Sequence, residues 1–443
     1  MKFMKFCFII LRTTSSCQAF YEVLESGGDG MAERAILHSD LNSFYASVEM
    51  MLNPRLRGKA VAVCGSTEDR HGIVLAKSEL AKKAGVKTGM VNWEARQLCS
   101  DLIVVPPQYD QYLKYSKLTQ AIYQRYTDLM EPFGMDECWL DVTGSRTVFG
   151  SAMQIAEDIR RTVREELGLT VSIGVSFNKI YAKLGSDMKK PDAITEIRRD
   201  TYKEQVWPLK VDEMIYCGRA TTAKLAKYGI YTIGQLAAAN PDFLKRLLGV
   251  NGLALWSYAN GTDQSRVMHK DFVSPVKSIG HGITCVADLE NNEEVKKVIL
   301  ALCQDISHRL RLHELAAKTV QVHVRGNDLF GSQFQCKLPF QTQLSTEIAA
   351  TAYRAFREHY RWSTKVRAVT VRAIELVPQR TPDQLSLFVD HNRVQKKEKL
   401  ENAVESIRSR FGKKAITYAL LMGDLKMPDD GRHSVKMPGM MYQ

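Results

Sequence analysis

Residues 133–142 read FGMDECWLDV, and the fold follows from this stretch. Apolar side chains recur at every second position from Cys138 to Val142, which is the period of a strand with one buried face. Two adjacent carboxylates, Asp136 and Glu137, stand near its start. Two like charges held together raise the free energy unless a cation compensates them. The stretch therefore predicts a strand that presents acids to a metal ion.

A third acid lies upstream in a similar setting. Residues 36–42 read ILHSDLN, so Asp40 stands near the end of another predicted strand. Two neighbouring strands with acids at the sheet edge would build an oxygen-ligand site for two Mg²⁺ ions. Such a site serves in-line phosphoryl or nucleotidyl transfer.

The composition indicates a soluble globular protein with a basic balance. Its 443 residues are enough for several domains, and the hydrophobic and charged contents are 45% and 25%. The formal charge of +12 fits a polyanionic partner, although many basic proteins have none. Nine cysteines without a C-x-x-C pair argue against a disulfide framework or a structural zinc site and favour the reducing cytoplasm.

The first residues differ in texture from the rest. We expect residues 1–33 to be an extension that is disordered or that precedes a true start at Met31. Its apolar run, 6–11, is too short for a signal peptide or a membrane span. No later stretch reaches membrane-spanning length, so no membrane partner is expected.

The remaining chain divides by its patterns into an α+β protein of several parts. Strands are predicted at 35–41, 60–64, 72–76, 102–105, 136–143 and 170–175, and helices at 112–130, 151–167 and near 392–411. The apolar stripe of the first helix would be Tyr115, Leu118, Ile122, Tyr126 and Leu129. The predicted parts are an α+β domain at 34–195, short helices broken by glycines at 196–265, a linker at 266–275, a second α+β domain at 276–380, and a tail at 381–443.

Two features suggest nucleic-acid contact without establishing it. Residues 228–236, YGIYTIGQL, resemble half of a helix-hairpin-helix, which meets phosphates through backbone N–H groups. An ordinary helical domain explains this spacing equally well. Residues 266–380 hold 17 Lys and Arg against 11 Asp and Glu, which describes either a solvated surface or a groove that follows a nucleic-acid backbone.

Three ordered blocks resemble the Y-family DNA polymerases, the lesion-bypass enzymes related to bacterial DNA polymerase IV. The blocks are HSDLNSFYASVE at 38–49, DECWLD at 136–141, and SFNK, AK and KKP within 176–191. Any one would be weak, but three in order are a strong signal. The resemblance covers about 35–390 and is nearest in appearance to a Firmicute-type branch with UvrX-like members.

The resemblance implies a right-hand polymerase fold. Residues 34–195 would form the fingers and a ferredoxin-like palm, 196–265 a helix-hairpin-helix thumb, and 276–380 an α+β little finger. It implies a template-directed DNA polymerase that uses primer-template DNA, dNTPs and two Mg²⁺ ions. Such an enzyme extends a primer past damage with low fidelity, has no proofreading domain, and acts as a monomer.

The metal ligands carry over residue by residue. Asp40 and Asp136 match the carboxylates that hold both metals, and the backbone carbonyl of Leu41 matches a further ligand. Glu137 matches the acid that completes the site at the primer terminus. The expected catalytic residues are therefore these three acids. Asp141 shares the face of Glu137 but could equally be a structural hydrogen-bond acceptor, so it is not expected to bind metal.

Five residues are expected to handle the nucleotide. Tyr45 matches the steric gate, whose ring collides with a ribose 2′-OH. Phe44 and Tyr45 would offer backbone N–H groups to the triphosphate, with Phe44 also packing in the core. Lys190 and Lys183 match triphosphate-binding lysines, and Lys82 stands where the family has an arginine in the fingers.

Three departures from the family pattern leave a rival open. Glu79 replaces a tyrosine, Lys82 an arginine, and Gly134 a serine. A protein that binds DNA and clamp and only displaces the replicative polymerase would tolerate such changes, although the intact acids argue against it. A two-metal nuclease is the other rival, but it would need neither Tyr45 nor Lys190.

The tail holds a short apolar motif. Residues 384–388 read QLSLF and resemble the peptide by which bacterial polymerases dock on the β-type sliding clamp. The leucines and the aromatic ring would fill an apolar pocket while the glutamine amide makes hydrogen bonds. The expected clamp-binding residues are Gln384, Leu385, Leu387 and Phe388.

Overall fold

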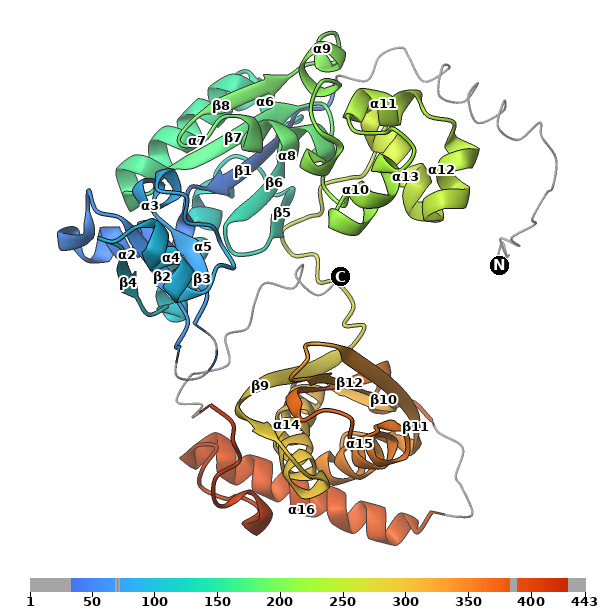
Figure 1. Cartoon of the computed structure of the whole chain (residues 1–443). Coiled ribbons are helices and arrows are strands. Elements are labelled where there is room, and N and C mark those ends of the chain that lie inside the picture. Colours follow the sequence, from blue (N-terminus) through green and yellow to red (C-terminus); the bar gives the residue numbers. More distant parts are fainter. Residues whose placement is uncertain (1–32, 68–69, 71, 383–388, 429–443) are drawn as a thin grey trace.

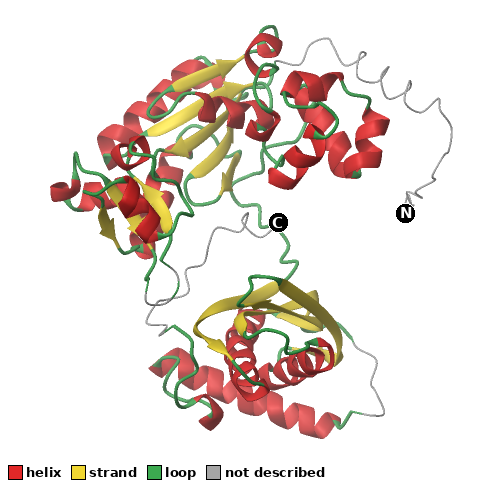
Figure 2. Cartoon of the chain, viewed as in Figure 1, coloured by secondary structure: helices red, strands yellow, loops and turns green. Residues whose placement is uncertain are grey.

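The computed structural model describes residues 33–67, 70, 72–382 and 389–428. All but the last residue of the predicted extension 1–33, and the clamp segment 384–388, lie outside the described residues. The described chain forms three sheets with helices packed around them (Figures 1 and 2), which confirms the α+β class. No helix in the described ranges is both long and apolar enough to cross a membrane.

A five-stranded sheet carries the predicted acids. Its order is β5-β6-β1-β7-β8, with β1 antiparallel to both of its neighbours. The strands are β1 (Ile36–Leu41), β5 (Met130–Phe133), β6 (Glu137–Asp141), β7 (Val171–Ser176) and β8 (Ile194–Ile197).

Helices cover both faces of this sheet and therefore bury every residue of β1. The helices are α5 (Tyr109–Tyr123), α6 (Arg146–Phe149), α7 (Ala152–Leu167) and α8 (Lys179–Met188). Helices α5 and α7 share a core with Leu37 and Leu140 on one face. Helix α8 lies on the other face, where Ala182 packs against Ile36 and Trp139. Because side chains alternate along a strand, Asp40 points to the α8 face.

The stretch 133–142, predicted as one strand, is a hairpin. Strand β5 ends at Phe133, and β6 begins at Glu137. Gly134 has a φ of +88°, a conformation that glycine adopts without the steric penalty of a Cβ. The strand predicted at 136–143 corresponds to β6, whereas Phe133 belongs to β5 and Asp136 lies in the turn between the two strands.

The predicted helix 112–130 is also shorter than expected. Helix α5 ends at Tyr123, and a turn leads from it to β5. In this turn the hydroxyl of Thr127 donates a 2.7 Å hydrogen bond to the carbonyl of Asp141. The buried stripe runs through Tyr112, Ser116, Thr119, Ile122 and Tyr123. The predicted stripe of Tyr115, Leu118, Ile122, Tyr126 and Leu129 was wrong at Leu118 and Leu129, which are exposed.

A smaller three-stranded sheet matches the strands predicted at 60–64, 72–76 and 102–105. Its order is β3-β2-β4. The elements of this region are α2 (Phe44–Leu52), η1 (Pro54–Leu56), β2 (Val61–Cys64), β3 (Val74–Lys77), α3 (Glu79–Lys83), α4 (Asn92–Leu98) and β4 (Ile103–Val105).

Short helices follow, as the glycine-rich pattern predicted. They are α9 (Tyr202–Val206), η2 (Val211–Glu213), α10 (Arg219–Ala226), α11 (Ile233–Ala238), α12 (Pro241–Leu248) and α13 (Val250–Ala259). Their core includes Ile180, Tyr181 and Leu184 of α8, which attaches them to the first sheet. Between α10 and α11 the chain turns at Gly229 (φ +76°), and Thr232 and Gln235 form a capping box at α11.

The second α+β unit is a four-stranded antiparallel sheet in the order β11-β10-β12-β9, packed on two helices. Its elements are β9 (Ile279–Leu289), α14 (Asn292–Leu312), β10 (Leu315–Gly326), β11 (Gly331–Thr342), α15 (Ser345–His359) and β12 (Val366–Pro378). The tail adds α16 (His391–Phe411) and η3 (Ala419–Leu421). Helix α16 lies across α14 and α15, on the side away from the sheet (Figure 1).

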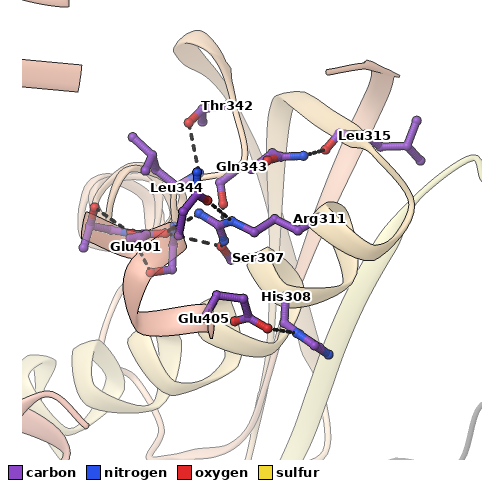
Figure 3. A network of polar contacts seen from close by, with 12 residues as sticks. Ser307, His308, Arg311, Leu315, Thr342, Gln343, Leu344, Glu401 and Glu405 are labelled. Atoms are coloured by element: carbon purple, nitrogen blue, oxygen red, sulfur yellow. Dashed lines mark hydrogen bonds and ion pairs between the residues drawn. The ribbon is translucent and has the colours of Figure 1, made fainter. Parts of the chain in front are cut away.

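Glu401 of α16 fixes the tail to this unit. Its carboxylate accepts hydrogen bonds from the backbone N–H groups of Ser345 (3.0 Å) and Thr346 (3.3 Å), the first residues of α15. Arg311 of α14 lies 3.0 Å from the same carboxylate (Figure 3). The first N–H groups of a helix have no intrahelical acceptor and favour a negative charge. Glu401 therefore caps α15 from a segment more than fifty residues away.

The predicted linker 266–275 has no helix or strand, yet its first half is docked. The side chain of Val267 is buried against the first sheet, and the N–H of Met268 donates a 2.9 Å hydrogen bond to Glu131. Lys270 pairs with Asp128 at 2.7 Å. The chain is thus held to the first sheet as far as Lys270.

Candidate active site

The predicted acids meet at one end of the first sheet. Pairing of β1 with β6 places Asp40 directly opposite Glu137. The N–H of Leu41 donates a 3.0 Å hydrogen bond to the carbonyl of Asp136, which holds the turn against β1. The side chains of Asp40 and Glu137 therefore share the face that α8 covers.

Both predicted triphosphate lysines contact these acids. The Nζ of Lys190 lies 2.6 Å from Oδ2 of Asp40 and 2.8 Å from Oδ1 of Asp187. The Nζ of Lys183, on α8, forms an ion pair with Glu137. The site thus has two carboxylate–ammonium pairs, with all four side chains largely shielded from solvent.

Burial and mutual repulsion shape the ionisation of the acids. Burial raises the pKa of Asp40 to about 7, against the opposing charge of Lys190. Burial and the negative charge of Glu137 raise the pKa of Asp136 to about 6. Burial alone would raise the pKa of Glu137 as well, but the hydrogen bond with His38 and the charge of Lys183 lower it to about 2. The site therefore holds more negative charge than its surroundings stabilise easily.

The chemistry of this donor set fits a hard divalent cation. Asp40, Asp136 and Glu137 offer carboxylate oxygens from adjacent segments, which are the ligands that Mg²⁺ prefers. Within the described ranges, no three His, Cys, Asp or Glu side chains are gathered closely enough to hold a metal ion as they stand. Lysine amines engage two of the acids instead, so metal binding would require those lysines to move aside.

His38 lies against the acids, although it was not among the predicted site residues. Its Nε2 lies 3.3 Å from Oε2 of Glu137, and its Nδ1 lies 2.8 Å from Oγ of Ser186. Burial lowers the pKa of His38 to about 4, so the ring is neutral near pH 7. Its place two residues before Asp40, on the same strand face, was the signal that could have found it.

Asp141 lies on the face of Glu137, as its parity predicted, but at the far end of the strand. Its Oδ1 accepts a 3.0 Å hydrogen bond from the N–H of Thr143, and its Oδ2 lies 4.0 Å from Arg34. Its register partner is Ile36, four residues before Asp40. Asp141 therefore serves as a structural acceptor.

The predicted gate, Tyr45, lies in the first turn of α2. Its ring is stacked on Tyr112 of α5, and its hydroxyl lies 3.2 Å from Sδ of Met135. Burial raises the pKa of Tyr45 to about 12, so the phenol is neutral. Phe44 is buried in the core, as expected, and the N–H groups of this first turn have no acceptor within the helix.

A cavity of about 950 Å³ opens beside the acids. It lies between the first sheet, the short helices and the linker, and its lining includes Tyr45, Asp136, Glu137, Tyr216, Tyr258 and Arg266. Carboxylates, the predicted gate and aromatic rings therefore face one space. Three of the predicted site residues, Tyr45, Asp136 and Glu137, line this cavity.

Lys82 pairs with Glu79, and Glu79 has a second partner in Ser43. The side chain of Lys82 is 52% exposed and lies 3.8 Å from Glu79. Glu79 accepts a 2.9 Å hydrogen bond from the hydroxyl of Ser43, which has a left-handed φ of +48° between β1 and α2. Glu79 and Lys82, two of the departures from the family pattern, thus form a polar chain with Ser43.

Comparison with known proteins identifies the class and then the family. A solved Y-family DNA polymerase chimera has the same fold, with a TM-score of 0.69 and 22% identity over 77% of this chain and 99% of that chain. The profile of the impB/mucB/samB family matches residues 39–187, and that of its C-terminal domain matches 276–387. DNA polymerase IV of Acetivibrio thermocellus is 48% identical over 88% of this chain and 98% of its own length. DNA polymerase IV 1 of Bacillus subtilis is 38% identical over 86% and 92%.

The fold is that of the solved Y-family polymerase chimera. The chain belongs to the impB/mucB/samB family. It aligns with relatives named DNA polymerase IV over nearly the whole length of those relatives. It is an enzyme, a DNA-directed DNA polymerase. The resemblance inferred from the three sequence blocks is thereby confirmed.

Proposed function

We propose that the chain is a low-fidelity DNA polymerase that copies primer-template DNA past damaged bases without proofreading. One observation carries this most directly: paired strands place Asp40 opposite Glu137, beside two lysines and a cavity lined by Tyr45. The combination suits nucleotidyl transfer with a cationic grip on a triphosphate. The short helices and the basic 276–380 unit would hold the DNA backbone.

Asp40, Asp136 and Glu137, with the carbonyl of Leu41, would hold two Mg²⁺ ions. When bound, such ions lower the pKa of the primer 3′-OH and neutralise charge on the pyrophosphate. The buried ring of His38 lies 3.3 Å from the carboxylate of Glu137 and would limit its movement by packing beside it. The turn at Gly134 and the hydrogen bond from Leu41 fix Asp136 against β1.

Lys190 and Lys183 would exchange partners when a nucleotide binds. In the described structure they neutralise Asp40 and Glu137. A triphosphate with its cations brings new negative charge to the lysines and new positive charge to the acids, so both sets of groups gain opposite charges by exchanging partners. Lys82, exposed and beside Glu79, would contribute only after the fingers region moved.

The first test is primer extension with Mg²⁺ and four dNTPs on an undamaged template and on one with an abasic site. We expect the wild type to extend past the lesion and Glu137→Gln to lose at least about 10²-fold in rate on both templates. Tight DNA binding without extension would instead support a displacement protein. Shortening of the primer by the wild type, absent from Glu137→Gln, would identify a nuclease.

Residues 384–388 would bind a β-type sliding clamp. Replacing Leu387 and Phe388 with alanine is expected to reduce clamp-stimulated synthesis about tenfold, since apolar anchors dominate such peptide contacts. Synthesis without clamp should stay within about twofold, because the segment follows the last strand of the 276–380 unit. An equal loss in both assays would assign the segment a structural role.

The protein is proposed to act as a monomer. Sedimentation at the mass of one chain, 50.1 kDa, would support this proposal.

A further inference from the structure

The ring of Tyr45 rests flat on a second, fully buried tyrosine. The rings of Tyr45 and Tyr112 have centroids 4.1 Å apart and planes only 7° from parallel. Tyr109 meets both rings edge-on, at 6.1 Å and 5.9 Å. The ring centroid of Phe44 lies 6.2 Å from that of Tyr112. Aromatic edge-to-face and stacked contacts each add to stability beyond their buried area, so this group is a rigid support for one face of Tyr45.

A buried carboxylate fixes the supporting ring from behind. The hydroxyl of Tyr112 donates a 2.5 Å hydrogen bond to Oε1 of Glu49, and Gln108 donates a 2.7 Å hydrogen bond to Oε2. Glu49 is only 4% exposed and Tyr112 is fully buried. A buried charge raises the free energy of the fold unless hydrogen bonds compensate it. The buried Glu49 side chain is therefore best explained by its role in holding Tyr112 and Gln108.

The stack of Tyr45 on Tyr112 and the hydrogen bonds to Glu49 both join helix α2 to the start of helix α5. Tyr45 and Glu49 are four residues apart on α2, and Gln108 and Tyr112 are four apart at the start of α5. Residues at this spacing share one helix face. The hydrogen bonds to Glu49 therefore fix the distance and rotation of α5 relative to α2. They thereby fix the position of the Tyr112 ring against Tyr45.

We propose that Tyr112, held by Glu49, is a positioning residue for sugar selection. This rests on the proposed role of Tyr45 as the steric gate. A gate that acts by collision excludes a 2′-OH only if its ring cannot retreat, and Tyr45 has the stacked ring of Tyr112 directly behind it. A retreat of the order of 1 Å would remove the collision, and displacements of this size change rates by orders of magnitude. Ribonucleotide exclusion therefore depends on the fixed position of Tyr112 as well as on Tyr45.

The test compares insertion of one dNTP with its matching rNTP opposite an undamaged template base. Tyr112→Leu, which removes the stack, is expected to lower the dNTP-to-rNTP ratio of kcat/KM about tenfold or more. Tyr112→Phe, which keeps the ring and loses the hydrogen bond, should lower the ratio about threefold. In both variants the gain should be in rNTP insertion, with dNTP kcat/KM within about threefold of the wild type.

Tyr123→Phe is the matched control. Tyr123 is on the same helix and equally buried, and its hydroxyl donates a 2.8 Å hydrogen bond to Ser39 rather than supporting Tyr45. Its loss of a buried hydroxyl should lower Tm by an amount similar to that of Tyr112→Phe and leave sugar selectivity unchanged. A selectivity change of the same size in Tyr123→Phe would overturn the proposal, because general loosening of α5 would then explain the effect.

Tyr45→Ala separates this inference from the proposed function. If Tyr45→Ala lowers sugar selectivity and folded Tyr112→Leu and Tyr112→Phe do not, the gate stands and the support role of Tyr112 is wrong. If Tyr45→Ala leaves selectivity unchanged, the gate assignment itself is wrong and the inference fails with it. Should Tyr112→Leu not fold, the milder Tyr112→Phe still decides between these outcomes.

Discussion

Asp136→Asn is expected to lower the rate of single-nucleotide insertion by at least about 10³-fold, because loss of a charged metal ligand removes several kcal/mol of transition-state stabilisation. The substitution keeps the shape of the side chain and removes its charge. Asp136 lies in the turn that Leu41 holds against β1, so the backbone that presents the side chain should be unchanged. The affinity for primer-template DNA, measured by fluorescence anisotropy, should therefore stay within about threefold.

Asp141→Asn provides the matched control for this prediction. Asp141 is the last residue of β6, the strand that follows Asp136, and it lies on the same face as Glu137. Its carboxylate accepts a hydrogen bond from Thr143 and does not line the cavity. The asparagine carbonyl can accept the same bond, so insertion should stay within about threefold of the wild type. Insertion retained by Asp136→Asn, or lost equally in Asp141→Asn, would refute the assignment of Asp136 as a metal ligand.

The gathering of the acids could be predicted because it depends on local pattern alone. Strand period puts Glu137 and Asp141 on one face, and antiparallel pairing of the two acidic strands in the observed register places Asp40 opposite Glu137. The hairpin at Gly134 could not be read in the same way. The alternation is interrupted at the adjacent acids Asp136 and Glu137, which mark the start of the predicted strand, and the four residues of β5 before the turn are too few to show a period of their own.

Contacts between distant segments account for most of what was missed. The pairing of Lys190 with Asp40 depends on how α8 packs across the sheet, which no spacing in the sequence reveals. The capping of α15 by Glu401 likewise joins two segments across an intervening strand. The stripe of α5 was misplaced because aromatic residues occur on two adjacent faces of that helix, and only packing decides which face is buried.

The support of Tyr45 also lies in this class of missed contacts. Glu49 belongs to the first sequence block and Tyr112 to a helix sixty residues later. A glutamate in an amphipathic helix ordinarily points to solvent, and nothing in the local sequence distinguishes this one. Its role becomes visible only when α5 supplies two hydrogen-bond donors to it. The sequence pattern therefore indicates which acids gather at the site, but it does not indicate the contacts that hold the neighbouring side chains in position.

Lys190→Ala is expected to lower kcat/KM for dNTP insertion about 10²-fold, the usual loss when one cationic or hydrogen-bond donor to a transferring phosphate is removed. Burial opposes the charge on Lys190, but Asp40 and Asp187 together raise its pKa well above the usual value. The amine is therefore charged at any working pH and is available to a triphosphate. Adjacent Lys189, which is exposed at the end of α8, is the control, and Lys189→Ala should insert nucleotides within about twofold of the wild type.

The affinity for Mg²⁺ in the absence of nucleotide should change in the opposite direction. The ammonium of Lys190, 2.6 Å from Asp40, competes with any cation for the same carboxylate oxygen. Its removal should therefore tighten Mg²⁺ binding to the enzyme–DNA complex, by about threefold or more in a calorimetric titration. Weaker Mg²⁺ binding together with slower insertion would instead mean that Lys190 only holds Asp40 in position. If Lys190 exchanges Asp40 for the triphosphate, Lys190→Ala must bind Mg²⁺ more tightly and insert nucleotides more slowly. A lysine that only positioned Asp40 could not improve metal binding while it impaired nucleotide insertion.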